Sequence, residues 1–298
     1  MKRFIVFVSI LLVATAALML ANEAVNKHLL FTSSNVNAYK MYRLIQERPA
    51  NEVAIIGSSR AEAGFAPKEI SPDAFNYGLS GSSMRETLFH LKCLLGRDSE
   101  APIIVNLDPW GLGNGNFLGD YRLVANSPEV QSEPKKIKLP IADRIPGLRF
   151  HGKFRSNIAE CMNNRLAVTK TMERGAILQR LSRNDEEWAY IIAKCKPSKF
   201  GCNAETKALL DELLCSNASR KIAFVVSPVA PPWWERFEGK AELIEFEQYL
   251  ASYPNVQVLD FTDSAYGFDL PEFMDLTHLN EQGARRFSRL LKEHLRIQ

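Results

Sequence analysis

The stretch Val53-Ala54-Ile55-Ile56-Gly57-Ser58-Ser59-Arg60 decides the fold class. Four apolar residues that end at a glycine are typical of a strand buried on both faces of a parallel sheet. A short strand ending near Asn76 follows, and later apolar runs stand at 103–105, 222–226 and 256–259, with helical spacing at 84–95, 241–250 and 279–295. Strands that alternate with helices predict an α/β domain with a parallel sheet and helices on both of its faces.

The composition excludes several other classes of protein. Of the 298 residues, 46% are hydrophobic and 24% are charged, which is enough apolar material for a full core and excludes disorder over most of the length. The net charge is only +3, so we expect no nucleic-acid partner. No repeat of 20–50 residues is present, which argues against a solenoid or propeller.

The N-terminus predicts a membrane segment. Residues 4–21 carry no charge and follow Lys2 and Arg3. Their length is close to the thickness of a bilayer core, and the basic flank favours a cytoplasmic N-terminus with an exported domain. We therefore expect an uncleaved anchor over 1–24, a helical stalk over 25–49 and one domain over 50–298. A cleaved signal with a site at Ala14-Thr15-Ala16 is the alternative, and a buried soluble helix is a third.

The middle of the chain shows no convincing strand. Between about 112 and 220 the apolar spacing, around 158–168 and 204–214, indicates a mostly helical insertion over one end of the sheet. Cys195 and Cys202 flank Gly201 and can close a small loop, while Cys93, Cys161 and Cys215 make the total odd, so at least one thiol is free or pairs with another chain. The cysteines and histidines lack the spacing of a zinc site, so no metal is expected.

Polar residues follow three of the expected strands, where ligands bind in parallel sheets. Gly57-Ser58-Ser59 follows the first strand, a loop with Gly78 and Gly81 follows the second, and Asn106 stands at the end of the third with Asp108 two residues on. A hydroxyl on a sharp turn and a glycine-containing loop at a helix start can serve as nucleophile and anion-binding nest. Helix caps and ordinary turns are the alternative interpretation of the same residues.

Near the C-terminus, Asp275 stands three residues before His278. This spacing lets a carboxylate orient an imidazole and stabilise its charged form. None of the other four histidines has an aspartate at that position, although one such pair among five histidines also arises by chance.

Taken in order, these blocks resemble the SGNH (GDSL-like) hydrolase superfamily over about residues 50–110 and 220–298. The resemblance implies a flavodoxin-like, three-layer α/β/α fold with Ser59 as nucleophile, Asp275 and His278 as its partners, and Gly81 and Asn106 as oxyanion donors. The sequence departs from the family pattern at Ser58, where an aspartate is usual, at Arg60, where a leucine is usual, and in the third block, where only Asn106 and Asp108 remain.

The variant blocks and the membrane segment resemble the branch that works beside membrane-bound O-acyltransferases. That resemblance implies an extracytoplasmic esterase or O-acyltransferase acting on an acylated glycan or acyl donor, held in the inner membrane by a single span. The alternatives are a non-catalytic accessory protein with the same fold and a plain exported binding protein. No P-loop, dinucleotide fingerprint or metal cluster is present, so no cofactor is expected.

Three further residues are candidates for substrate binding. Arg60 stands at the expected mouth of the site and can hold an anionic group, or it is an ordinary surface arginine. Trp233 and Trp234 follow the strand at 222–226 in a proline-rich stretch, where they can stack on sugar rings or touch the bilayer. The alternative is that one of the two is buried under the insertion.

Overall fold

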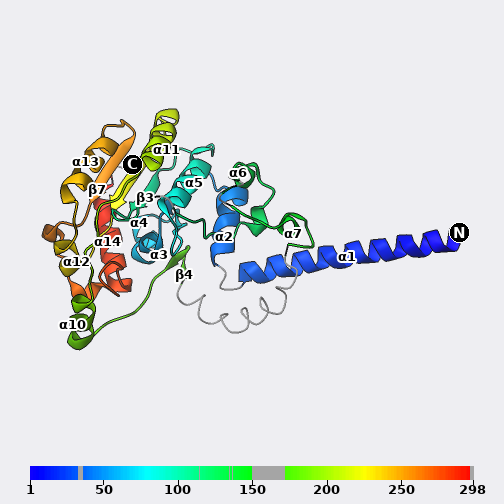
Figure 1. Cartoon of the computed structure of the whole chain (residues 1–298), viewed down its shortest axis with the longest axis horizontal. Helices are drawn as coiled ribbons and strands as arrows, with labels where there is room; N and C mark the ends of the chain where they lie inside the picture. Colours follow the sequence, from blue (N-terminus) through cyan, green and yellow to red (C-terminus); the bar gives the residue numbers. More distant parts are fainter. Residues whose placement is uncertain (33–35, 114, 134, 136, 150–171, 296–298) are drawn as a thin grey trace. The chain divides into compact units, whose positions relative to one another are not determined.

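A computed structural model gives the architecture of the chain (Figure 1). It describes residues 1–32, 36–113, 115–133, 135, 137–149 and 172–295. These residues form two compact units. One combines residues 1–47 with 119–170, and the other combines residues 48–118 with 171–298.

The larger unit contains a five-stranded sheet in which every strand is parallel. Its strands are β1 (Val53–Ile56), β2 (Ala74–Asn76), β3 (Ile103–Leu107), β6 (Ile222–Val226) and β7 (Val256–Asp260). Their order is β2-β1-β3-β6-β7, so the order of connection reverses beside β1. This is a doubly wound arrangement, in which ligands bind beyond the carboxyl ends of the strands near the reversal. The five strands and the parallel sheet predicted from the sequence are confirmed.

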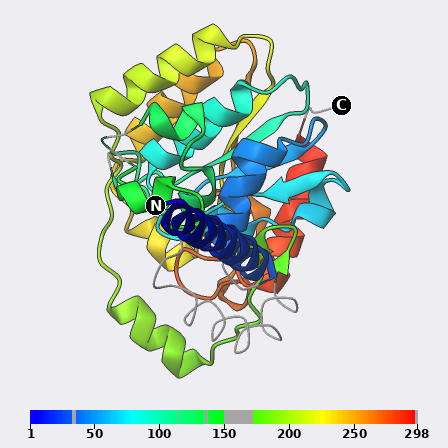
Figure 2. The same ribbon diagram turned by 90° about the vertical axis from the view of Figure 1, so that its right-hand side faces the viewer.

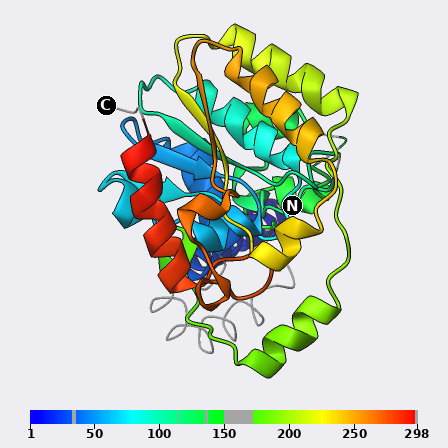
Figure 3. The ribbon, with the colours of Figure 1, turned by 90° about the vertical axis from the view of Figure 1, so that its left-hand side faces the viewer.

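Helices cover the sheet in two layers. The helices α5 (Met84–Leu95), α11 (Ala204–Ser216) and α13 (Lys240–Ala251) lie together on one side, and α14 (Glu281–His294) lies on the other with α3 (Ser59–Gly64) and α4 (Pro67–Ile70) (Figure 3). Phe287 of α14 packs edge-on against Phe65 and Phe261, with ring centroids 5.0 and 5.2 Å apart. Asn280 caps α14 by accepting a hydrogen bond from Gly283 N at 3.0 Å.

The chain between β3 and β6 differs from the predicted helical insertion. Its helix α11 packs on α5, so it belongs to a sheet-covering layer. Residues 172–177 form a hairpin of β4 (Met172–Glu173) and β5 (Ala176–Ile177), and the prediction of no strand here is wrong. Each strand has only two residues, too few for any apolar pattern, and the turn depends on positive φ at Arg174 and Gly175. The predicted helical spacing at 158–168 lies outside the described residues.

Short helices complete the larger unit. The helix α10 (Asp185–Ala193) lies away from the sheet between two extended connections (Figure 2). The others are α12 (Pro231–Glu235), η3 (Ser264–Tyr266) and η4 (Leu270–Glu272). Cys195 and Cys202 are free thiols, so the small loop considered from their spacing is not closed by a disulfide. Cys93 and Cys215 are free as well, whereas Cys161 lies outside the described residues.

The smaller unit begins with the long helix α1 (Lys2–Thr32). Its window Lys2–Val25 is apolar enough to span a membrane, and it is not buried by the part of the chain that the structure describes, unlike the helix of a soluble core. The expected stalk consists of α2 (Val36–Tyr42) and the π-helical turn η1 (Arg43–Glu47). In α2, Ala38 is buried and packs against Leu123 of η2 (Arg122–Val124). The helix α2 is therefore packed against other residues of its unit and is not a solvated stalk. The same unit holds α6 (Pro128–Gln131) and α7 (Ile141–Arg144).

Candidate active site

Ser59 follows β1 on a sharp turn and begins α3. Gly57 makes this turn with φ of +148°, and a Cβ there would lie 2.9 Å from the Cβ atoms of both Ala61 and Asn106. Only glycine satisfies both constraints. Ser58 caps α3 by accepting a hydrogen bond from Arg60 N at 3.3 Å, which leaves the adjacent Ser59 at the first helical position. The turn therefore presents the Ser59 hydroxyl at the carboxyl edge of the sheet.

The structure brings Ser59, His278 and Asp275 together. The Ser59 Oγ lies 2.7 Å from His278 Nε2 across 219 residues of sequence. On the other side of the ring, His278 Nδ1 lies 2.9 Å from Asp275 Oδ2. The hydrogen-bond network is satisfied when Nδ1 carries the proton and Nε2 accepts from the serine, which is the form that a general base requires.

The loop that carries His278 is fixed by Asp275. Its Oδ1 accepts hydrogen bonds from the backbone N–H groups of Thr277 at 2.8 Å and of His278 at 2.9 Å. Burial alone would raise the pKa of Asp275, but these bonds and the imidazole outweigh it and hold that pKa at about 2. Asp275 is therefore ionised at neutral pH.

Gly81 lies in the loop between β2 and α5. Its φ of +79° favours glycine, and a Cβ there would lie 2.8 Å from a methyl group of Leu118. The preceding residue, Ser80, is held by Glu62 of α3, which accepts hydrogen bonds from its backbone N–H at 3.2 Å and from its hydroxyl. Glu62 stands one helical turn after Ser59, so one helix positions both the nucleophile and the predicted oxyanion loop. Sequence reasoning missed Glu62.

Asn106 is the penultimate residue of β3, and its amide faces a neighbouring carboxylate. Its Nδ2 donates a hydrogen bond to Asp108 Oδ1 at 3.1 Å, and the residue is buried beneath the Gly57 turn. Asn106 is not among the residues that line the cavity at Ser59. The oxyanion role that the family resemblance implies for Asn106 therefore stays a prediction, and in this structure its amide donates to Asp108.

Arg60 does not stand at the mouth of the site, contrary to the prediction. Its side chain is only 2% exposed, and it forms an ion pair with Asp108 at 3.0 Å. It also donates to the backbone carbonyls of Thr277 at 3.2 Å, of Leu107 at 3.4 Å, of Pro228 at 3.2 Å and of Ser227. Burial lowers the pKa of the guanidinium, and the Asp108 carboxylate partly offsets this effect. Arg60 thus ties the ends of β3 and β6 to the histidine loop.

Asp108 is the common acceptor at this edge of the sheet. It receives hydrogen bonds from the Ser58 hydroxyl, from Asn106 and from Arg60. The departures of the sequence at Ser58 and Arg60 are therefore linked, because both side chains contact the same carboxylate.

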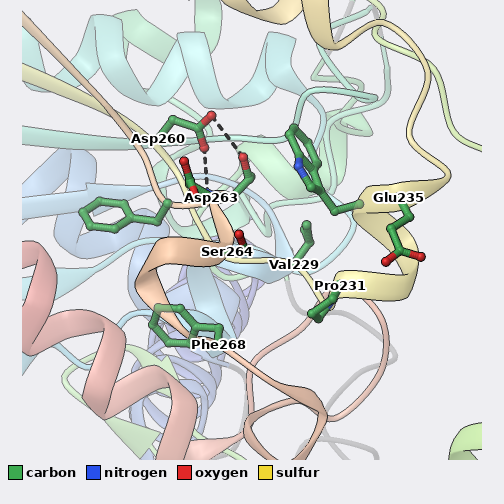
Figure 4. A pocket seen from close by; sticks show the side chains of 10 residues that line it. Val229, Pro231, Glu235, Asp260, Asp263, Ser264 and Phe268 are labelled. Carbon is green, nitrogen blue, oxygen red and sulfur yellow. Dashed lines mark hydrogen bonds between the residues drawn. The ribbon is translucent and has the colours of Figure 1, made fainter.

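The two tryptophans do not line the cavity at Ser59. Trp233 is buried, as the alternative expected of one of the two, but it packs on Trp110 and Phe237, with ring centroids 4.3 and 5.2 Å apart, and neither residue belongs to the predicted insertion. Trp234 is partly exposed, stacks on Phe237 and lies 5.1 Å from the Lys240 ammonium. It borders a different cavity of about 480 Å³ at the ends of β6 and β7, seen in Figure 4 beside Pro231, Glu235, Asp260, Asp263 and Phe268. Burial raises the pKa of Asp260 in that cavity, although its hydrogen bonds from Thr262 oppose the shift.

The cavity at the triad has a volume of about 320 Å³. It is lined by Ser59, Glu62, Ala63, Ser80, Ile177, Gln179, Leu181, Arg183, Met274, Asp275 and His278. Four of these belong to residues 176–183, which we call the wall segment. It is held by hydrogen bonds from Glu281 N to the Gln179 carbonyl at 2.8 Å and from Asn280 Nδ2 to the Leu181 carbonyl at 3.2 Å. No motif marked this segment in the sequence.

Among the described residues, no group of three or more histidine, cysteine, aspartate or glutamate side chains could hold a metal ion. The arrangement of Ser59, His278 and Asp275 is suited to activate the serine hydroxyl as a nucleophile, because a base oriented by a carboxylate lies beside it.

Comparisons with known proteins assign no family. No family model matches the chain, and no curated protein matches it. Among solved structures, it is similar to a candidate platelet activating factor from Streptococcus pneumonia, with 14% identity over 92% of this chain and 98% of that one and a TM-score of 0.44. This degree of similarity identifies neither a family nor an activity.

Proposed function

We propose that the chain is a serine-dependent acyl esterase or O-acyltransferase of the SGNH type. The observation that carries the proposal is the continuous hydrogen-bonded path from Ser59 through His278 to Asp275, at 2.7 and 2.9 Å. A nucleophile, a base and an orienting carboxylate at these distances are the requirements of covalent acyl transfer.

In the proposed reaction, Ser59 Oγ attacks the carbonyl carbon of an ester while His278 Nε2 takes the hydroxyl proton. The tetrahedral intermediate collapses, the bond to the leaving alkoxide breaks, and the imidazolium returns its proton to that oxygen. The acyl group is now esterified to Ser59. Water or a sugar hydroxyl then attacks it, giving hydrolysis or transfer respectively.

The negative oxygen of the intermediate needs hydrogen-bond donors, each worth about 10²–10³-fold in rate. The backbone N–H of Ser59 has no carbonyl partner within its own helix, because it belongs to the first turn. The N–H of Gly81 follows Ser80, which lines the same cavity. We assign these two groups to the oxyanion hole.

The substrate side of the proposal rests on the family resemblance and on the apolar N-terminal helix. We propose an extracytoplasmic domain held by one span in the inner membrane, acting on an exported or cell-envelope glycan beside a membrane-bound O-acyltransferase. The cavity at Ser59 combines apolar side chains (Ala63, Ile177, Leu181, Met274) with Gln179 and Arg183, which suits a short acyl group on a polar carrier.

The test is fluorophosphonate labelling of the purified full-length protein. We expect labelling of the wild type, its loss in Ser59→Ala and its retention in Ser264→Ala, which removes a serine from the separate cavity at β6 and β7. His278→Ala should also abolish labelling, whereas Asp275→Asn should leave residual reactivity, because the imidazole remains but its orientation weakens. Release of acetate against transfer to an added oligosaccharide then separates esterase from transferase.

An unlabelled wild-type protein, or equal labelling of Ser59→Ala, would refute the enzyme proposal. The non-catalytic accessory protein would then replace it.

A further inference from the structure

The smaller unit carries a segment that contacts α1 inside its apolar stretch. Gly147 approaches α1 so closely that a Cβ on it would lie 2.7 Å from Met19 Cβ and 3.1 Å from the Met19 carbonyl oxygen. The same glycine donates its backbone N–H to Glu23 at 3.1 Å, and Arg149 pairs with Glu23 at 3.0 Å. Residues 137–149, here called the collar segment, are therefore attached to α1 between Met19 and Glu23.

The depth of this attachment follows from helix geometry. The apolar window Lys2–Val25 has 24 residues, or about 36 Å of helix, against a hydrocarbon layer of about 30 Å. When the window is centred in a bilayer, Met19 lies about 7 Å inside the hydrocarbon boundary and Glu23 lies close to that boundary. A backbone that touches Met19 therefore lies just below the hydrocarbon boundary, within the roughly 5–10 Å to which interfacial segments enter a bilayer, whichever way the helix crosses.

The charges at this point fit such a location. A glutamate at the end of a membrane span is costly unless it is paired. Glu23 has Arg149 as its partner, and that arginine also donates to the carbonyls of Arg122 and Leu123 at 3.1 and 3.2 Å. The collar segment thus neutralises the only acidic side chain within the Lys2–Val25 window.

The outer surface of the collar segment is apolar with basic neighbours. Ile141 is 79% exposed and Ile145 is 41% exposed; Ile141 is the first residue of the α7 turn and Ile145 is its C-cap. Lys135 and Lys138, just before this turn, are exposed as well. Isoleucines beside lysines are the composition of a surface that enters the headgroup layer of an anionic membrane.

We propose that the collar segment is a second membrane contact, in which Ile141 and Ile145 insert into the bilayer interface beside α1 while Lys135 and Lys138 face anionic headgroups. The contact holds the smaller unit against the membrane surface instead of leaving it on a flexible tether. It depends on α1 spanning the membrane and is independent of any chemistry at Ser59.

The test is depth-dependent quenching in proteoliposomes of phosphatidylcholine and phosphatidylglycerol in equal parts. A polarity-sensitive fluorophore is attached to Ile141→Cys in a full-length variant whose five native cysteines are serine. Ile10→Cys, within the apolar window, is the lipid-exposed control, and Ile244→Cys, on α13 with an isoleucine that is 53% exposed, is the control outside the collar segment.

We expect blue-shifted emission at position 141 and quenching by lipids that carry a spin label near the headgroup, with deeper labels quenching position 10 more strongly. Emission and quenching at position 141 equal to those at position 244 would overturn the proposal. If lipid labels do not quench the fluorophore at position 10, α1 does not span the membrane and the proposal is overturned. Fluorophosphonate labelling of Ser59 in the same vesicles tests the enzyme proposal separately.

If the cysteine-free variant does not fold, a photo-crosslinking phenylalanine analogue at position 141 in the native background replaces it. Crosslinks to lipid at position 141 but not at position 244 support the contact, and their absence at both positions contradicts it.

Discussion

Replacing Arg60 with methionine distinguishes two roles for this residue: an exposed substrate-binding arginine, as predicted from the sequence, and a buried cross-link, as observed in the structure. Methionine keeps much of the length and volume of the side chain but removes the charge and every donor. In the folded protein, Asp108 would keep its hydrogen bonds from Ser58 and Asn106 and would lose its counter-charge. The backbone carbonyls that Arg60 now serves, including that of Thr277, would lose a buried donor.

The expected loss of stability is large. Removing one partner of a buried ion pair costs about 3–5 kcal/mol of unfolding free energy. For a domain of roughly 150–250 residues, each kcal/mol corresponds to about 2–4 °C, so we expect Tm to fall by about 6–20 °C. An arginine at the mouth of the site, as predicted from the sequence, would give a change within about 0.5 kcal/mol.

The assay is thermal unfolding followed by tryptophan fluorescence in detergent, since the Arg60 guanidinium lies 4.8 Å from the Trp110 ring. The matched control is Arg85→Met, which removes an ion pair of similar length, 3.1 Å, whose partner Glu205 is half exposed. That pair should contribute at most about 1 kcal/mol. Equal Tm values for Arg60→Met and Arg85→Met would refute the assignment of Arg60 as a buried cross-link.

Three further predictions concern the Gly57 turn, the predicted oxyanion loop and the stability of the protein at low pH. Gly57→Ala should prevent stable folding, because φ of +148° and two contacts at 2.9 Å exclude a Cβ, whereas Gly96→Ala, with its nearest neighbours at 3.6 Å or more, should keep its Tm. Glu62→Ala should lower kcat on a simple acetyl ester by up to about 10²-fold with little change in KM, because Ser80 loses its anchor; an unchanged kcat would place the oxyanion donors elsewhere. Because the pKa of Asp275 is lowered to about 2, its ionised form stabilises the fold above about pH 4 and this contribution disappears as the pH falls toward 2. Acid titrations of Tm should therefore show a smaller loss in Asp275→Asn than in the wild type, and identical losses would contradict the lowered pKa.

The strands and the three triad residues were predictable because local signals mark them. Continuous apolar runs identify buried parallel strands, and the carboxyl edge of such a sheet collects the residues that follow them. Ser59 stands directly after such a strand, whereas Asp275 and His278 precede the last helix and were assigned from their spacing and the family resemblance.

The contacts around the triad were not predictable in the same way. Arg60 follows the nucleophile directly, and nothing in its neighbours distinguishes a buried cross-link from a surface side chain. Its burial depends on carbonyls at Ser227 and Thr277, which are more than 160 residues distant in sequence. The wall segment had no signal either, because an extended chain that crosses a helix follows no period.

The separation of Ser59 and His278 by 219 residues also bears on biosynthesis. A nascent chain that has been made as far as α12 already contains the nucleophile, its turn, Trp233 and Trp234, yet it does not contain the base. The loop with His278 and the helix α14 that supports it are translated after β7, so the hydroxyl is unactivated through most of synthesis. On the proposed chemistry, a growing chain would cleave no ester, and the complete triad would form when the His278 loop and α14 pack onto the sheet.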